Sequence, residues 1–63
     1  METRIKECRK ALGMTQEELS KKAGVSTVVI SQLENGTRDV ITSDTMKKIS
    51  QALDKPIEQI FLI

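Results

Sequence analysis

Side chains that form hydrogen bonds without carrying a full charge gather in one short stretch, TVVISQLEN, at residues 27–35. If this stretch is a helix with about 100° between successive residues, Ile30 and Leu33 lie within about 60° of each other and face inward. The opposite face then combines small hydroxyls, amides and an exposed valine: Thr27, Val28, Ser31, Gln32 and Asn35. Val29 falls on the boundary. A solvated helix face normally carries charged residues, so this face is unusual.

A DNA major groove would account for such a face. The groove admits one α-helix, amides bond to adenine through two hydrogen bonds, hydroxyls bond to several base edges, and a methyl group contacts the thymine C5-methyl. The exposed Val28 would then have a partner. In the alternative interpretation, Val28 and Val29 form a second apolar contact, either with the fourth helix or with the other subunit of a dimer.

Catalytic and metal-binding chemistry is not indicated. The sequence has no histidine, one cysteine, no paired carboxylates in an identifiable cleft and no phosphate-cradling loop, so we expect no enzyme, metal, cofactor or small-molecule substrate. Cys8 has the spacing of a core residue. The N-terminal METRIKECRK has no apolar segment typical of an export signal, and the longest apolar run is IFLI, so we expect no membrane span.

Glycines and hydroxyl residues punctuate the chain in a helical pattern. Each of the first three apolar-periodic stretches ends at a glycine, the residue that favours the left-handed position after a helix: Gly13, Gly24 and Gly36. Thr15 and Ser26 follow two residues after the first two glycines and are typical N-caps. Glu18 completes a capping box with Thr15. The short Gly-Val-Ser connection at residues 24–26 indicates a helix-turn-helix.

These signals predict five helices. Four run from Thr3 to Leu12, Gln16 to Ala23, Thr27 to Asn35 and Ile57 to about Phe61. The remaining helix, the fourth along the chain, starts beside the cap-forming Thr42-Ser43-Asp44. Thr37 to Ile41 is expected to be a loop, and Pro56 to separate the last two helices. At 63 residues the chain can build one thin core, which must be aliphatic because Phe61 is its one aromatic residue. The expected inward residues are Ile5, Cys8, Leu12, Leu19, Ala23, Ile30, Leu33, Met46, Ile49 and Leu53.

The motifs LGMTQEEL, AGVS, ISQLENG and TMKKI resemble those of the Cro/phage-repressor (Xre-type) helix-turn-helix family, over about Ile5 to Phe61. The resemblance implies an all-α, compact five-helix, lambda-repressor-like fold. It implies one domain at 1–63, with the helix-turn-helix core at about 15–35. The implied function is that of a repressor-like transcriptional regulator that binds double-stranded DNA in the cytoplasm of a bacterial or phage-type system, with the third helix in the major groove.

The resemblance also implies roles for individual residues. It places Thr27, Val28 and Gln32 at base-contacting positions, with Val29 and Ser31 beside them. It assigns contacts with the DNA backbone to Gln16, Asn35, Thr37 and Arg38. It pairs Arg9 with Glu34 in a structural salt bridge.

The apolar C-terminus predicts a partner. A chain of this length is not expected to bury all four of Ile60, Phe61, Leu62 and Ile63 internally, so residues 57–63 are a candidate dimerisation segment. A homodimer would bind the two half-sites of a pseudo-palindromic operator. The alternative is an antitoxin-like or other protein-interaction module, whose apolar tail binds another protein and whose DNA binding is secondary.

Overall fold

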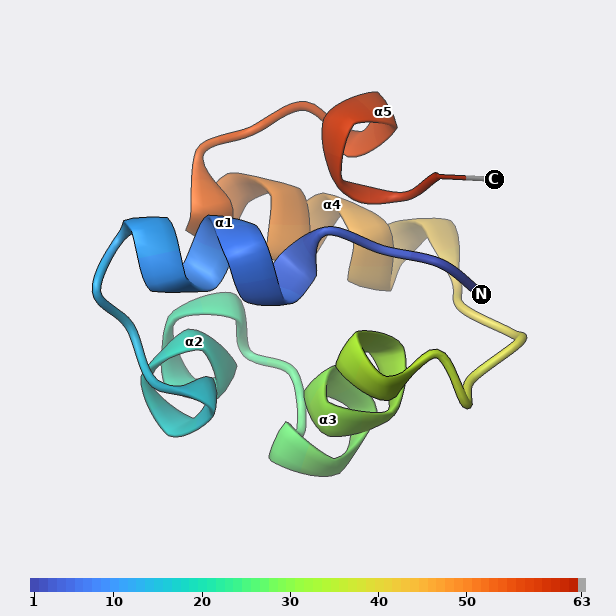
Figure 1. Ribbon diagram of the computed structural model, residues 1–63, viewed down its shortest axis with the longest axis horizontal. Coiled ribbons are helices and arrows are strands. Elements are labelled where there is room, and N and C mark those ends of the chain that lie inside the picture. The colour runs from blue at the N-terminus through green and yellow to red at the C-terminus, as the bar shows by residue number, and fades with distance from the viewer. Residues whose placement is uncertain (63) are drawn as a thin grey trace.

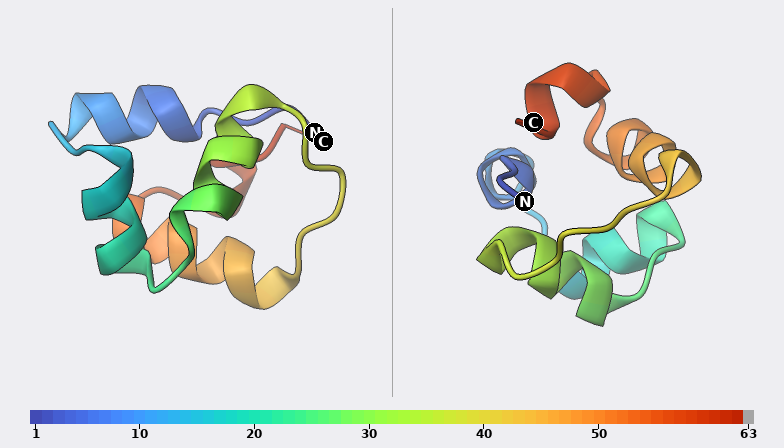
Figure 2. Two further views of the ribbon diagram at one scale, coloured as in Figure 1. Left: turned by 90° about the horizontal axis from the view of Figure 1, so that it is seen from below. Right: turned by 90° about the vertical axis from the view of Figure 1, so that its right-hand side faces the viewer.

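The fold, taken from a computed structural model that describes residues 1–62, contains five helices and no strand in that range (Figure 1). The helices are α1 Ile5–Ala11, α2 Gln16–Ala23, α3 Thr27–Asn35, α4 Ser43–Leu53 and α5 Ile57–Ile60. The predicted all-α, five-helix fold is confirmed. α2 and α3 lie on one side of α1 and α4, and α5 lies on the other side (Figures 1 and 2).

Apolar residues from all five helices meet in one core. Its buried members are Ile5, Leu19, Ala23, Ile30, Leu33, Ile49, Ala52, Leu53, Ile60 and Phe61. Partly buried side chains, among them Cys8, Met14 and Met46, pack against this core. The 3.6-residue spacing of the apolar positions therefore orients α2, α3 and α4 as predicted.

Local signals start α2 and α3 where the sequence predicts. The Thr15 hydroxyl accepts from the Glu18 backbone N–H at 3.1 Å, and the Glu18 carboxylate accepts from the Thr15 N–H at 3.0 Å. The hydrogen bond from the Thr15 N–H, followed by that with its hydroxyl, lowers the pKa of Glu18. This contribution to stability is therefore present above the ordinary pKa of a glutamate and is lost as the pH falls through the lowered value. The Ser26 hydroxyl caps α3 by accepting from the Val29 N–H at 3.3 Å.

The first helix is shorter than predicted at both ends. Thr3 pairs with Phe61 in an isolated antiparallel bridge, and the Arg4 N–H donates to the Ile60 carbonyl at 2.7 Å. These bonds hold the N-terminal residues in an extended arm beside the C-terminal segment, so the helix begins at Ile5. Leu12, expected in the core, caps the C-terminus of α1 and is 51% exposed, because the helical spacing stops at Ala11.

The expectation of an exposed apolar tail is wrong for two of its four residues. Ile60 is 0% exposed and Phe61 is 5% exposed, because α5 folds over α4 and the bridge to Thr3 draws Phe61 inward. Their side chains stabilise the chain's own core and offer almost no surface to a partner. Leu62 is half-buried, and Ile63 lies outside the described residues. No helix within residues 1–62 has the length and apolar character needed to cross a bilayer.

Candidate nucleic-acid interface

α3 presents the uncharged face that the helical wheel predicts. Ile30 and Leu33 are both 0% exposed and hold the helix on the core, whereas Val28 on the opposite side is 62% exposed. Thr27 and Asn35 are exposed, and Ser31 and Gln32 are half-buried. Val29 is also half-buried and packs against the core.

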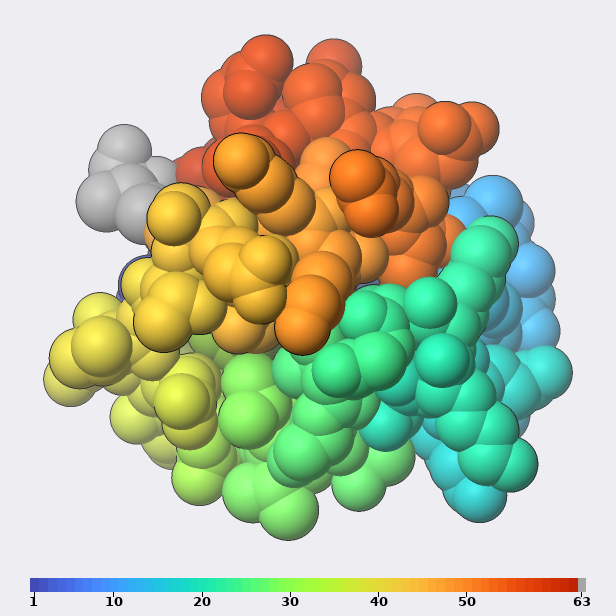
Figure 3. All heavy atoms as spheres, turned by 180° about the vertical axis from the view of Figure 1, so that it is seen from behind, coloured from blue at the N-terminus to red at the C-terminus, as the bar shows by residue number. Residues whose placement is uncertain are grey.

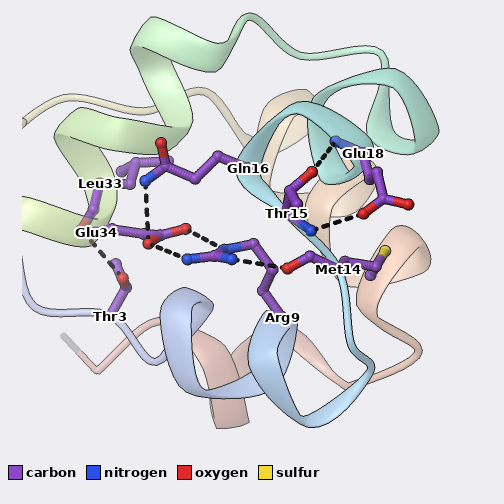
Figure 4. A network of polar contacts seen from close by, with 8 residues as sticks. All are labelled: Thr3, Arg9, Met14, Thr15, Gln16, Glu18, Leu33 and Glu34. Carbon is purple, nitrogen blue, oxygen red and sulfur yellow. Dashed lines mark hydrogen bonds and ion pairs between the residues drawn. The ribbon is translucent and has the colours of Figure 1, made fainter.

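A polar network fixes the C-terminal end of α3 (Figure 4). The Glu34 carboxylate accepts from Arg9 Nε at 2.9 Å and Nη2 at 3.1 Å, which confirms the implied ion pair between α1 and α3. Arg9 Nη1 also donates to the Met14 carbonyl at 2.7 Å. The Arg9 and Glu34 side chains are only 10% and 2% exposed. Since water reaches neither charge freely, each depends on the opposite charge of the other for its stabilisation.

The hydrogen bonds to Glu34 raise the pKa of Arg9 above its ordinary value, although burial of the guanidinium opposes the shift. Arg9 therefore keeps its charge wherever the protein is folded at ordinary pH. The guanidinium joins α1, the α1–α2 connection and α3, because its three nitrogens bond to Met14 and Glu34. It is not free to contact DNA.

Two further side chains anchor the same end of α3. Gln16, the first residue of α2, donates from Nε2 to Glu34 Oε1 at 3.2 Å, so it braces α3 while its second N–H stays available to another acceptor. The Thr3 hydroxyl donates to the Leu33 carbonyl at 3.1 Å. Sequence reasoning missed Thr3, because no local pattern shows that the N-terminal arm passes the end of α3 (Figure 4).

The N-terminal end of α3 has a different character. Its first turn contains no acidic residue, whereas the first turn of α2 contains Glu17 and Glu18. The first amides of a helix lack partners within the helix and carry the positive end of its dipole. An anion such as a phosphate is therefore favoured at the start of α3, where no carboxylate repels it.

The residues that follow α3 fold back onto Gln32. After the left-handed Gly36, the Thr37 N–H donates to the Gln32 carbonyl at 3.1 Å. Arg38 Nη1 donates to the Gln32 side-chain Oε1 at 2.9 Å, and Arg38 Nε donates to the Val40 carbonyl at 2.9 Å. Val40 itself is 75% exposed, an apolar residue that the sequence did not single out.

Part of the predicted contact set lies in one region. The start of α3, the loop at 37–42 and the first turns of α4 adjoin one another on the face shown in Figure 3, coloured green, yellow and pale orange. A shallow hollow between them is lined by residues from the α2–α3 turn, α3, the loop and α4, including Val25, Val29, Arg38, Ile41 and Lys48. Gln16 does not line this hollow and instead contacts Glu34 near the C-terminal end of α3.

Known proteins are similar to this chain in sequence and in fold. A helix-turn-helix family model matches residues 5–60. An uncharacterized HTH-type transcriptional regulator of Archaeoglobus fulgidus is 42% identical over 62 residues, which are 98% of this chain and 87% of that protein.

Two solved structures are also similar. The restriction-modification controller protein C.AhdI from Aeromonas hydrophila has a TM-score of 0.82 and 31% identity, over 92% of this chain and 86% of that one. A chain of the SinR protein/SinI protein complex also has a TM-score of 0.82, with 33% identity over 87% of this chain. This chain spans only 53% of that neighbour.

Proposed function

The chain belongs to the helix-turn-helix family, and from this premise we propose that it is a transcriptional regulator that binds specific sequences of double-stranded DNA. The observation that carries the proposal is the exposed, uncharged face of α3, with Val28 62% exposed at its centre. The N-terminal half of α3 enters the major groove, and the bound protein represses by excluding polymerase from the same DNA. We place this activity in the cytoplasm of a bacterial or phage-type system.

Thr27, Val28 and Gln32 are proposed to contact base edges, with Ser31 beside them. The hydroxyl and amide groups can bond to bases, and the Val28 methyls can contact a thymine methyl. Val29 supports this surface from the edge of the core rather than from within the groove. Contacts with phosphates are assigned to exposed or half-buried residues at the borders of this surface: Gln16, Asn35, Thr37 and Arg38.

The short length of α3, the helix proposed to contact the bases, supports the proposal of a homodimer. α3 has nine residues, so it is about 13 Å long and spans about four base pairs. A four-base-pair site recurs about once in a few hundred base pairs, which is far too often to define a single operator. Two copies on half-sites about 34 Å apart would supply the missing specificity. Within the predicted tail, the half-buried Leu62 is the described residue that keeps surface for such a contact.

Selection of bound sequences from a random pool of duplex DNA tests the proposal. We expect one motif to be enriched at moderate salt, and its inverted repeat to report the dimer. Failure to enrich any sequence would favour the antitoxin-like alternative, in which the chain binds a protein partner.

Substitution of Gln32 tests whether the uncharged face of α3, called the reading face below, contacts base edges. Gln32→Ala is expected to cost about 1–3 kcal/mol of discrimination at one base pair, because an amide contact to a base edge is lost. Gln59→Ala is the matched control, since Gln59 is an exposed glutamine on α5, on the opposite side of the molecule (Figure 1). Equal losses of specific and nonspecific affinity in Gln32→Ala would contradict the base-reading role.

A further inference from the structure

Arg38 and Gln32 form a side-chain pair at the edge of the reading face. We propose that Arg38 is a positioning residue, which holds the Gln32 amide so that this glutamine reads the DNA as a donor and prefers guanine at the base pair it contacts. The inference rests on the proposed function. It gives Arg38 a second task beside the phosphate contact assigned to it above.

The chemistry of the pair fixes which way the amide lies. A guanidinium has only donors, so the atom of Gln32 that faces Arg38 Nη1 at 2.9 Å must be the carbonyl oxygen Oε1. The amide nitrogen then lies on the other branch of the planar group. Within residues 1–62, Nε2 of Gln32 makes no hydrogen bond, so both of its N–H groups are available to a ligand.

Arg38 is itself held in place. Its Nε donates to the Val40 carbonyl at 2.9 Å, so one guanidinium bonds both to the loop and to the glutamine. Thr37 adds two contacts to the backbone of the same glutamine, from its N–H at 3.1 Å and from its hydroxyl at 3.4 Å. A glutamine side chain loses considerable rotamer entropy when it is ordered. In this protein the contacts with Arg38 and Thr37 already order the glutamine in the absence of DNA, so less entropy is lost on binding.

A held amide selects among bases. An unrestrained glutamine recognises adenine by accepting from N6 while donating to N7. Because Arg38 turns Oε1 toward itself and occupies one of its two lone pairs, the amide presents Nε2 to the DNA, and guanine offers that donor two adjacent acceptors, N7 and O6. The positive charge of Arg38 beside Oε1 also withdraws electron density from the amide and strengthens its N–H donors. Guanine is therefore the expected partner.

The test compares Arg38→Lys with Arg38→Met on the selected operator and its three variants at the base pair that Gln32→Ala identifies. Lysine keeps the charge but lacks the planar fork that bonds Gln32 and Val40 together. Arg38→Lys is therefore expected to lose about tenfold of the preference for guanine while keeping its overall affinity for DNA within about threefold. Arg38→Met is expected to lose the same preference and to weaken all sites as well, because the charge is gone.

Combining substitutions separates positioning from a phosphate contact. The double variant Gln32→Ala with Arg38→Lys is expected to discriminate no worse than Gln32→Ala alone, because both changes remove one function. Lys22→Met, which removes an exposed charge from α2, is the charge control and should leave base preference unchanged.

Two results overturn the proposal. The first is an adenine preference in the unmodified protein. The second is an Arg38→Met variant that weakens all four sites equally and lowers the salt slope by about one, which is the behaviour of a phosphate contact alone. In either case an enriched operator and a site-specific loss in Gln32→Ala would still support the proposed function. If no operator is enriched, the proposed function fails as well.

Discussion

The two ends of α3 are built on different principles. At the C-terminal end, Arg9 and Gln16 bond to Glu34, and Thr3 bonds to the Leu33 carbonyl, so three separate segments hold the helix. At the N-terminal end, the Ser26 cap is the one side chain that bonds to the first turn within the described residues. One end is fixed by several polar contacts from other segments, and the other is held by a single side-chain cap.

This difference suggests how the domain keeps its orientation while its specificity can change. A buried ion pair contributes little net stability compared with apolar residues, but it defines one arrangement of the helices it joins. We infer that the network around Glu34 sets the direction of α3. Residues at the opposite end can then be exchanged without disturbing that direction.

The largest expected effect comes from breaking the fixed end. Arg9→Met is expected to lower the free energy of unfolding by about 3–5 kcal/mol, because it leaves the Glu34 carboxylate, 2% exposed, without a counter-charge. A core of this size supplies only about 3–5 kcal/mol, so most molecules should be unfolded at room temperature. Urea titration followed by circular dichroism measures the change.

The double variant Arg9→Met with Glu34→Met is the control for this prediction. It removes both charges and should recover most of the lost stability, since replacing both partners of a buried pair by apolar residues is often close to neutral. A loss below about 1 kcal/mol in Arg9→Met would contradict the view that the network fixes α3. Such a small loss would show that the Glu34 carboxylate is hydrated when Arg9 is absent.

Local signals explain how much of the fold the sequence could predict. Caps such as Thr15 and Ser26, and left-handed glycines such as Gly24, act within a few residues, so the bounds of α2 and α3 agree with prediction. The exposed position of Val28 followed from the same local periodicity. The family resemblance added the Arg9–Glu34 pair, which no spacing rule reveals.

Contacts between distant segments explain what could not be predicted. Thr3 leaves the predicted helix because it pairs with Phe61, a residue 58 positions away in the sequence. The same pairing buries Phe61 and removes it from the expected partner surface. Within the site, the bond from Arg38 to Gln32 depends on the path of the loop after Gly36, which composition alone does not define.

A smaller effect on stability is expected at the N-terminal end of α3, called the free end below because fewer side chains hold it. Ser26→Ala should lower the free energy of unfolding by about 1 kcal/mol, because the Val29 N–H loses its acceptor. Since this end is proposed to enter the major groove, operator affinity should fall as well. Ser50→Ala is the control, because it removes the hydrogen bond from the Ser50 hydroxyl to the Lys55 carbonyl, and neither residue lines the hollow beside the start of α3. An equal drop in operator affinity in both variants would mean that general destabilisation, rather than the end of α3, controls binding.

The smallest effect on the fold is expected at the centre of the reading face. Val28→Ala should change the free energy of unfolding by less than about 0.5 kcal/mol, because the side chain is 62% exposed. It should nevertheless weaken operator binding by about three- to fivefold, since about 0.8 kcal/mol is lost when one of the two methyl groups that are removed had contacted a thymine methyl. Replacing that thymine by uracil, which lacks the methyl, should weaken the unmodified protein by a similar factor and leave Val28→Ala unaffected. If uracil weakens both proteins equally, the thymine methyl is contacted elsewhere, and the free end of α3 does not read bases through Val28.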